Sequence, residues 1–479
     1  MAKQIIYSSN LLFFYVAVLI ITLSHISNVA SDSLEEGNAL LKWKASLQIP
    51  NNSLLSSWLP LPMNSNTSIL CNSWFGVICN VDGSIQKLNL TTSGLNGTLH
   101  QFSFSLLHNL THFKLSVNNF FGPIPPEIRL LSKLVYLDFS QNKFSGVIPP
   151  EIGNLHQLTI LYLNSNNISG SIPSSLGDLT TLKVLYLYKN QLSGPMPTKF
   201  GNLKSFTNLA SLTDLDLSYN QLSGSIPLSL ANLSTLQNLF LDGNKISGVI
   251  PQGLGNLDLL QLQLTGNQLY YTSGAWIYES LEVLDLSTNS LNGSIPKGIG
   301  QWARIHYLNL SNNKLSEKIP SEIGKLVQLT QLDLSQNLLT QEIPSEVQSL
   351  QCLQKLDLSH NRLSGSIPSA FTSLPREIDI DLSYNELTGP VPSSANFLNA
   401  SIQGNPGLCG NVVGVKLCAS QSMKKKNNSF HYRLILAIML PFIGAVLLTL
   451  FTYGLIAYRQ QNKKSPQKSL DEGRALDQY

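Results

Sequence analysis

The sequence predicts an α/β solenoid, a stack of short coils that share one parallel sheet, followed by a single transmembrane helix. A repeated unit predicts the stack: LDLSYNQLSGSIP at residues 215–227 returns as LDLSHNRLSGSIP at residues 356–368. Leu137, Leu161 and Leu185 open successive copies at a spacing of 24 residues, a period typical of solenoid repeats. A charge-free run from Leu434 to Ala457 predicts the transmembrane helix.

Each copy opens with an apolar-x-apolar pair, the period-two pattern of a short strand with one buried face. One copy cannot cover its own apolar face, so copies stack and their strands join a parallel sheet along the concave side. At about 4.8 Å between strands, about 13 copies make a sheet roughly 60 Å long. The pairs begin at Leu88, Phe113, Leu137, Leu161, Leu185, Leu215, Leu239, Leu262, Leu284, Leu308, Leu332, Leu356 and Ile380.

An asparagine follows five residues after each of these anchors except the first, which has Ser93 at that place. The chain turns away from the strand there, and a buried backbone group without a partner costs about 1–3 kcal/mol. An inward-facing amide carries both donors and an acceptor, so it can satisfy two neighbouring turns. We therefore expect a structural row at Asn118, Asn142, Asn166, Asn190, Asn220, Asn244, Asn267, Asn289, Asn313, Asn337, Asn361 and Asn385.

An apolar-x-Gly-x-Ile-Pro sequence follows the asparagine, as in Leu222, Gly224, Ile226 and Pro227. The complete unit resembles the plant-type leucine-rich repeat of plant receptor-like kinases and receptor-like proteins. EEGNALLKWKASL with CNSWFGVIC resembles that family's N-terminal cap, and GNPGLCG resembles its C-terminal cap. Within the family, the chain most resembles the group of male-discoverer-interacting receptor-like kinases, although only the ectodomain and the membrane span are matched and the kinase domain is absent.

The ends of the chain predict where the repeats lie. Lys3, an apolar run from Leu11 to Leu23 and the small residues Ala30 and Ser31 are typical of a cleaved secretory signal peptide, with a signal anchor as the alternative. The expected segments are the signal peptide at 1–30, an N-terminal cap at 31–82, repeats at 83–392, a C-terminal cap at 393–420, a juxtamembrane linker at 421–433, the transmembrane helix at 434–457 and a cytoplasmic tail at 458–479.

This order predicts a single-pass protein embedded in the plasma membrane, with its N-terminus outside the cell. The helix of 24 residues would span about 36 Å, and basic residues follow it. All glycosylation sequons precede it, and only some are expected to carry glycans. They are Asn51, Asn66, Asn89, Asn96, Asn109, Asn167, Asn232, Asn292, Asn309, Asn399 and Asn427.

Four of the five cysteines form two close pairs in the caps. In a secreted chain, Cys71 with Cys79 and Cys409 with Cys418 predict disulfides that staple the ends of the stack. Cys352 is left over. Matching slots in other copies hold polar residues, so we expect Cys352 to face solvent as a spare thiol, with an intermolecular disulfide as the alternative.

A ligand surface is predicted where the copies depart from their default residues. The residues after the two strand leucines are usually Asp and Ser, and we expect nothing in the core to demand a departure from them. The departures are mostly aromatic, and aromatic side chains in register suit an extended peptide. The alternative is that the tyrosines only stack on one another across half-exposed strands. The candidate residues are Tyr136, Tyr162, Asn164, Tyr186, Tyr188, Phe240 and Asp242.

Composition and motifs exclude several classes of function. The net charge is only +3, which gives no basic face for nucleic acid. We find no phosphate-binding loop, no metal-spaced Cys/His cluster and no nucleophile elbow, so neither a cofactor nor a metal is expected. Only 22 residues follow Ala457, too few for kinase chemistry, and we expect no enzyme.

These expectations favour a cell-surface recognition protein that binds a secreted peptide. The family resemblance adds a leucine-rich-repeat co-receptor kinase, which would supply the signal and contact Asp357, Ser359, Asp381 and Tyr384. A decoy without a kinase, or a truncated product of a receptor kinase gene, stays open. An inhibitor of a cell-wall enzyme, of the polygalacturonase-inhibiting type, is a further alternative, although the membrane span argues against it.

Overall fold

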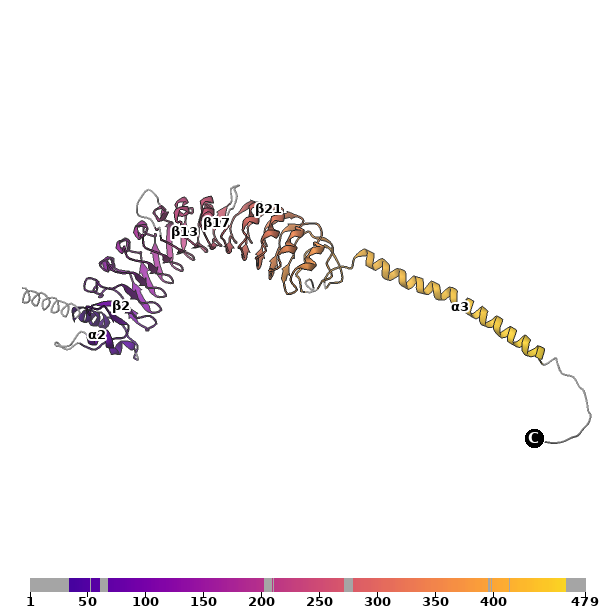
Figure 1. Cartoon of the computed structure of the whole chain (residues 1–479), viewed down its shortest axis with the longest axis horizontal. Helices are drawn as coiled ribbons and strands as arrows, with labels where there is room; N and C mark the ends of the chain where they lie inside the picture. The colour runs from indigo at the N-terminus through magenta and orange to yellow at the C-terminus, as the bar shows by residue number, and fades with distance from the viewer. Residues whose placement is uncertain are drawn as a thin grey trace, which may run out of the picture. The chain divides into compact units, whose positions relative to one another are not determined.

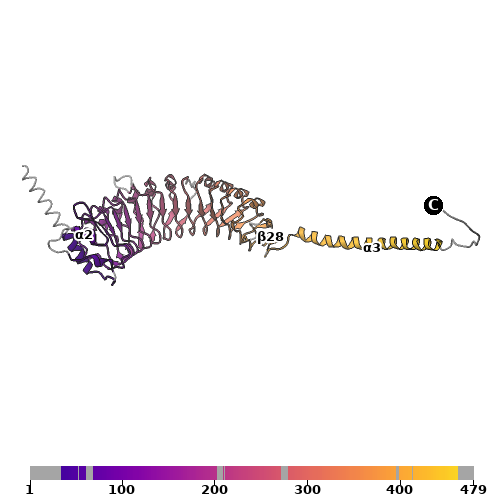
Figure 2. The ribbon, with the colours of Figure 1, turned by 60° about the horizontal axis from the view of Figure 1, so that its bottom comes forward.

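The computed structural model describes residues 34–51, 53–60, 68–201, 209, 211–270, 279–394, 397, 399–412 and 414–461. The chain divides into two compact units, Met1–Leu408 and Cys409–Tyr479. The first unit contains the repeats, which form a curved stack of coils (Figures 1 and 2). The expected signal peptide and the residues after 461 lie outside the described residues, and the expected segment boundaries stay predictions.

One sheet runs through the described repeats and confirms the predicted solenoid. It has 14 strands within the described ranges: β1 pairs antiparallel with β2, and the strands from β2 to β26 pair in parallel. Leu185 lies opposite Leu161 on one side and Leu215 on the other, so the register aligns the anchors. The strands are β1 (Val77–Cys79), β2 (Ile85–Asn89), β4 (His112–Lys114), β6 (Tyr136–Asp138), β8 (Ile160–Tyr162), β10 (Val184–Tyr186), β12 (Asp214–Asp216), β14 (Asn238–Phe240), β16 (Gln261–Gln263), β18 (Val283–Asp285), β20 (Tyr307–Asn309), β22 (Gln331–Asp333), β24 (Lys355–Asp357) and β26 (Asp379–Asp381).

Each coil then forms a second, outer strand. Several short parallel sheets result, because the outer strands pair over only two or three residues. The repeat pattern does not predict these outer strands. They are β3 (Asn96–Gly97), β5 (Asn119–Gly122), β7 (Lys143–Gly146), β9 (Asn167–Gly170), β11 (Gln191–Pro195), β13 (Gln221–Ser223), β15 (Ser247–Val249), β17 (Gln268–Tyr270), β19 (Asn292–Ser294), β21 (Lys314–Glu317), β23 (Leu338–Gln341), β25 (Arg362–Leu363), β27 (Thr388–Pro390) and β28 (Gly407–Cys409).

The Ile-Pro pair that ends most copies leads into a 3₁₀ helix. Pro227, for example, has φ −63° and directly precedes such a helix, whose Leu230 is buried. Proline's fixed φ suits that position, where its missing N–H costs nothing. The 3₁₀ helices are η1 (Leu54–Ser57), η2 (Pro126–Leu130), η3 (Pro150–Asn154), η4 (Ser174–Asp178), η5 (Thr198–Gly201), η6 (Leu228–Asn232), η7 (Gln252–Asn256), η8 (Lys297–Gln301), η9 (Ser321–Lys325), η10 (Ser345–Ser349) and η11 (Ser369–Ser373).

The asparagine row is buried, except for the half-buried Asn190 and Asn289, and it joins each coil to the one before it, as predicted. Asn142 Nδ2 donates to the carbonyl of Leu115 in the preceding coil at 2.9 Å, and Asn142 Oδ1 accepts from the Phe120 N–H at 2.9 Å. The amide also donates to Phe139 and Ser140 in its own coil. The same double link is made by Asn118, Asn166, Asn190, Asn220, Asn244, Asn267, Asn289, Asn313, Asn337, Asn361 and Asn385, and also by Asn405 in the C-terminal cap.

The N-terminal cap closes the first end of the stack. A helix over residues 34–45 buries Trp43, whose indole N–H donates to the Thr98 carbonyl at 2.9 Å. The ring of Trp43 lies 5.7 Å from that of Phe120 and 5.0 Å from that of Phe102. The short helix α2 (Ser68–Ser73) lies beside β1 and carries one cysteine of the cap. Aromatic packing therefore covers the apolar interior.

Both predicted disulfides are present, and Cys352 faces solvent as expected. Cys71 and Cys79 form a disulfide with Cα atoms 5.4 Å apart, and Cys409 and Cys418 form another with Cα atoms 4.9 Å apart. Cys352 is a free, exposed thiol.

A long helix, α3 (Ala419–Gln461), belongs to the second unit. Within it, Met439–Gln460 is long and apolar enough to cross a membrane, with a mean hydropathy of 2.0. This segment overlaps the transmembrane helix predicted at 434–457. Pro441 lies inside the helix, and transmembrane helices tolerate such a residue.

We expect Asn142→Ala to lower the free energy of unfolding by about 2–4 kcal/mol, because it leaves a buried donor and buried acceptors in two coils without partners. Urea unfolding of the full chain in detergent micelles, followed by tryptophan fluorescence, measures the loss. Asn119→Ala is the matched control, since Asn119 is an exposed residue of the same region. Equal stability of the two variants would contradict a structural role for the row.

Candidate functional site

The candidate site is the open face of the inner sheet, defined by the residues directly before and after each anchor. These residues are half-buried on most strands, whereas the anchor between them is buried, as in β8, β10 and β14. The register places Tyr186 opposite Tyr162 and Asp216, and Asp216 opposite Phe240. Side chains from successive coils therefore form two parallel columns on this face.

Four of the predicted tyrosines form one continuous aromatic row across β6, β8 and β10. The ring of Tyr162 lies 5.8 Å from that of Tyr136, edge to face, and 4.9 Å from that of Tyr186, stacked. Tyr188 continues the row at 6.0 Å from Tyr186. Tyr136 lies in the column before the anchor and Tyr162 in the column after it, so the row crosses from one column to the other. The contacts also fit the alternative that the rings stack on one another.

The other three predicted residues lie elsewhere. Phe240 is half-buried on β14, two strands beyond Tyr186, and Asp216 lies between them. Asn164 and Asp242 are only 4% and 6% exposed, so they offer little surface to a ligand. They occupy the position that holds a buried serine, such as Ser218 or Ser359, in other coils.

The default Asp-x-Ser sequence also has a structural role, which the repeat pattern alone does not reveal. Asp216 Oδ1 accepts from the Ser218 backbone N–H at 3.0 Å and from its hydroxyl at 2.6 Å. Asp138, Asp285, Asp333 and Asp357 make the same pair of bonds with the serine two residues on. Where tyrosine replaces the aspartate, as at Tyr162 and Tyr186, the coil lacks these two hydrogen bonds. The replacement therefore lowers the stability of the fold.

Burial changes the protonation of the aromatic row. It raises the pKa of Tyr136 and of Tyr186 to about 12, and it also raises the pKa of Tyr162 and of Tyr188. Nearby aspartates add to the rise, with Asp138 acting on Tyr136 and Asp214 on Tyr186. The phenols therefore stay neutral at any physiological pH, and each hydroxyl can both donate and accept a hydrogen bond.

Basic residues extend the row at its N-terminal end. The ring of His112 stacks on Tyr136 at 5.9 Å, and Lys114 Nζ lies 4.0 Å from the centre of the Tyr136 ring. Burial lowers the pKa of His112, and the charges of Lys87 and Lys114 lower it further. These three residues were not predicted from the sequence, because a lone basic side chain on a half-exposed strand gives no signal until its neighbours are known.

The residues predicted to contact a co-receptor lie near the other end of the sheet. Asp357 and Asp381 are neighbours across β24 and β26 and are half-buried. Tyr384 is 51% exposed, and its ring stacks on His360 at 4.4 Å. Ser359 is buried and bonds to Asp357, so it offers little surface.

The sequons differ in exposure. Asn51, Asn89, Asn167, Asn292 and Asn399 are exposed, whereas Asn96, Asn109, Asn232 and Asn309 are half-buried. Asn309 takes the place of the capping aspartate: its Oδ1 accepts from Ser311 and its Nδ2 donates to the Tyr307 hydroxyl. Asn66 and the side chain of Asn427 lie outside the described residues, and glycan occupancy stays a prediction at every sequon.

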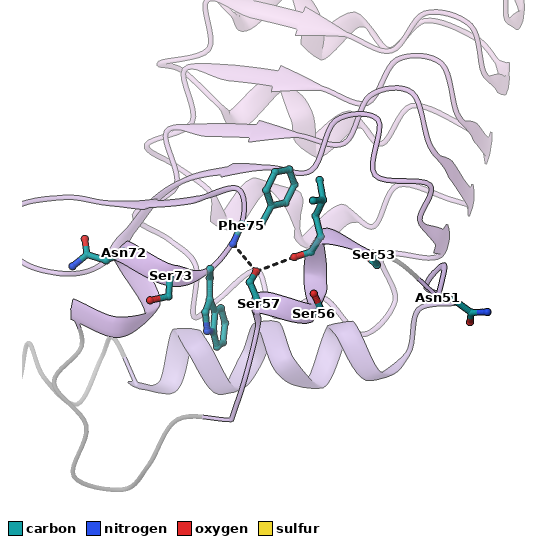
Figure 3. Close-up of a pocket in the computed structure, with 9 residues that line it drawn as sticks. Asn51, Ser53, Ser56, Ser57, Asn72, Ser73 and Phe75 are labelled. Carbon is teal, nitrogen blue, oxygen red and sulfur yellow. Dashed lines mark hydrogen bonds between the residues drawn. The ribbon is translucent and has the colours of Figure 1, made fainter.

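Hollows also lie away from the open face, and one of about 500 Å³ has Lys318 and Glu342 in its lining. Another of about 670 Å³ lies in the N-terminal cap (Figure 3), where the Ser57 hydroxyl accepts from the Phe75 N–H and donates to the Leu54 carbonyl, both at 2.9 Å. Its lining of Ser, Asn, Leu, Trp and Phe residues has no titratable side chain. Across the described ranges, no three His, Cys, Asp or Glu residues gather as metal ligands.

Comparison with known proteins identifies the repeats. Residues 33–80 match the leucine rich repeat N-terminal domain, and residues 269–376 match the leucine-rich repeat region. Residues 133–155, 156–222 and 235–257 match further leucine rich repeats. A leucine-rich repeat receptor-like protein kinase of Arabidopsis thaliana is 44% identical over 126 residues, and MDIS1-interacting receptor like kinase 2 of the same plant is 50% identical over 101 residues.

The chain is a leucine-rich-repeat protein related to the plant receptor-like kinases. It covers 10% and 9% of the length of those two relatives, and the matches cover 26% and 21% of the chain. Among solved structures, PEPR1-AtPEP1 is 34% identical with a TM-score of 0.69, covering 79% of this chain and 51% of that one. The plant peptide hormone receptor RGFR1 in complex with RGF2 is 36% identical with a TM-score of 0.60, covering 65% and 50%. The leucine-rich-repeat fold of this chain thus resembles ligand-binding receptors and not enzymes.

The raised pKa of Asp242 leads us to expect that the stability of the fold depends on pH. Burial raises its pKa to about 6, so the ionised form costs stability above that pH, and the cost disappears as the pH falls towards the ordinary aspartate value. We expect Asp242→Asn to stabilise the full chain by about 1–2 kcal/mol at pH 7.5 and much less at pH 4.5. Urea unfolding of both proteins at each pH measures this. A stability difference that does not change with pH would contradict the assignment.

Proposed function

We propose that this leucine-rich-repeat protein recognises an extended peptide at the cell surface, through the aromatic row on the open face of its inner sheet. The observation that carries the proposal is the row itself, Tyr136, Tyr162, Tyr186 and Tyr188, whose rings are in contact across three strands. All four are half-buried, so each ring keeps part of its surface for a ligand.

The cost of the row supports a binding role. Tyr162 and Tyr186 stand where other coils have the aspartate that caps the following turn, and each replacement removes two hydrogen bonds. Tyrosine offers a large, rigid apolar surface and a hydroxyl that can bond to a peptide backbone. A face that bound no ligand would gain nothing from replacing this aspartate by tyrosine.

The relatives support the same class of ligand. RGFR1 is a plant peptide hormone receptor solved in complex with RGF2, and its repeats resemble those of this chain. Resemblance in fold alone does not carry function. The proposal therefore depends on the aromatic row, and the relatives make a peptide the first class of ligand to test.

The proposal extends to the membrane and to a second protein. We place the repeats outside the cell, with α3 crossing the plasma membrane once through the apolar segment Met439–Gln460. A co-receptor kinase of the leucine-rich-repeat type would approach from the side, against Asp357, Asp381 and Tyr384, and would carry the signal inward. The exposed Tyr384 ring gives that contact its apolar centre.

The test is peptide capture by the full chain in lipid nanodiscs. We expect wild-type protein to retain a subset of a random decapeptide library, identified by mass spectrometry. The variant Tyr162→Ala/Tyr186→Ala/Tyr188→Ala should retain at least about tenfold less of these peptides. Tyr307→Ala is the matched control, because Tyr307 is a half-buried tyrosine of the same face outside the row. Unfolding midpoints of all three proteins show whether the fold persists. Retention that survives the triple substitution, or that wild-type protein never shows, would refute peptide binding at the row.

A further inference from the structure

The aromatic row has opposite charges at its two ends. Lys87 and Lys114 lie on β2 and β4 beside His112, at the N-terminal end. Asp214 and Asp216 lie on β12, one strand beyond Tyr186. Lys114 and Asp216 occupy the same column, the one directly after the anchor, as the register from strand to strand shows.

The basic end has no counter-ion within the described repeats. The ion pairs there join Lys199 to Asp178 and Arg304 to Glu282, and neither involves Lys87 or Lys114. Lys114 rests over the Tyr136 ring instead. Asp138 is the nearest carboxylate by register, but it is 8% exposed and already accepts two bonds from Ser140. An anionic group of a ligand would therefore meet two lysines that form no ion pair within the described repeats.

The acidic end is similarly unmatched by a cation. Asp214 accepts from the Asn238 amide and from the Thr213 hydroxyl, both at 2.6 Å, and these neutral donors leave its charge in place. Asp216 is held by Ser218, and the buried Asp242 adds a third carboxyl one strand further on. Burial raises the pKa of Asp216, and the charge of Lys189 opposes that rise without forming an ion pair in the described structure. A cationic side chain placed here would relieve the burial cost of these carboxylates.

The two ends have a fixed spacing that an extended peptide can match. Four strand steps separate β4 from β12, which at about 4.8 Å each makes roughly 19 Å. An extended peptide rises about 3.3 Å per residue, so about six residues cover the same distance. Because side chains alternate between faces, residues six apart point the same way, whereas residues five apart do not.

We propose that the ligand is an extended peptide with an anionic group and a lysine or arginine about six residues apart, the anion on Lys87 and Lys114 and the cation on Asp214 and Asp216. This rests on the proposed function, and it adds the chemistry and the length of the ligand. The residues between the charges cross Tyr136, Tyr162 and Tyr186, so apolar or aromatic side chains suit them. The anionic group is a carboxylate, supplied by an acidic side chain or by a free C-terminus.

The experiment sorts the peptides that the full chain retains in nanodiscs. A decapeptide library with both ends capped is applied, and retained peptides are sequenced by mass spectrometry. We expect pairs of opposite charge six residues apart to be enriched about threefold to tenfold over pairs five apart, with the enrichment falling as salt rises from 50 to 500 mM in this assay. A second library with a free C-terminus shows whether that carboxylate replaces the acidic side chain.

Variants assign each charge to its end. Lys87→Gln/Lys114→Gln should remove the preference for the acidic residue and keep that for the basic one. Asp214→Asn/Asp216→Asn should do the reverse, while the asparagines still accept from Thr213 and Ser218. Asp333→Asn/Lys355→Gln, on the same face but distant from the row, should change neither. Aromatic peptides retained without a charge preference, or a preference that the row-end variants leave intact, would overturn this inference and leave the proposed function standing; no retention at all would refute the proposed function.

Discussion

The rest of the structure depends on the hydrogen bonds that satisfy the buried backbone groups at the turn of each coil. Each coil must turn out of the inner sheet, and the turn leaves backbone groups in the interior that water cannot reach. The asparagine side chain satisfies its own turn and the preceding one together, as Asn142 does with Ser140 and Leu115. The interior leucines supply apolar area, and these amides tie each coil to its neighbour in addition to the backbone ladder of the inner sheet. Removing one therefore affects two coils.

This constraint explains which parts of the repeat can vary. The anchor and its asparagine stay five residues apart at Leu215 and Asn220, although the preceding unit is 30 residues long. The same spacing holds at Leu262 and Asn267, in a unit of 22 residues. Length changes fall instead in the segment between the asparagine and the next strand of the inner sheet. Most coils have a glycine with positive φ at one position of this segment. Glu317 and Gln341 take that position in two coils, with φ of 63° and 66°. The positive φ is thus kept at this position, and only the residue type varies.

The sequence predicted what repetition makes visible. The anchors and the asparagine row follow from spacing, both disulfides follow from close cysteine pairs in a chain expected to be secreted, and the structure confirms them. The outer strands and 3₁₀ helices did not follow, because they are too short to show a period of their own. Within the site, the sequence found Tyr162 and Tyr186 by their departure from a default, yet it could not show that Asn164 and Asp242 are buried. Tyr188 occupies the same position in its coil and is half-buried, so burial there depends on the packed stack and not on the position alone. The contact of Lys114 with Tyr136 depends on side-chain directions in adjacent coils, and no single repeat contains that information.

Each coil contacts only its nearest neighbours, and this limits how the stack can recognise a ligand. Coils far apart share no direct contact, so the basic residues on β4 and the carboxylates on β12 are coupled only through the strand spacing between them. That spacing, about 4.8 Å, does not match the rise of an extended peptide, about 3.3 Å per residue, so contacts cannot repeat coil by coil. Aromatic surfaces tolerate this mismatch, because a ring can be met at many offsets, whereas charges cannot. The tyrosines can therefore accept many sequences along the middle of a ligand, while the charged ends select its length.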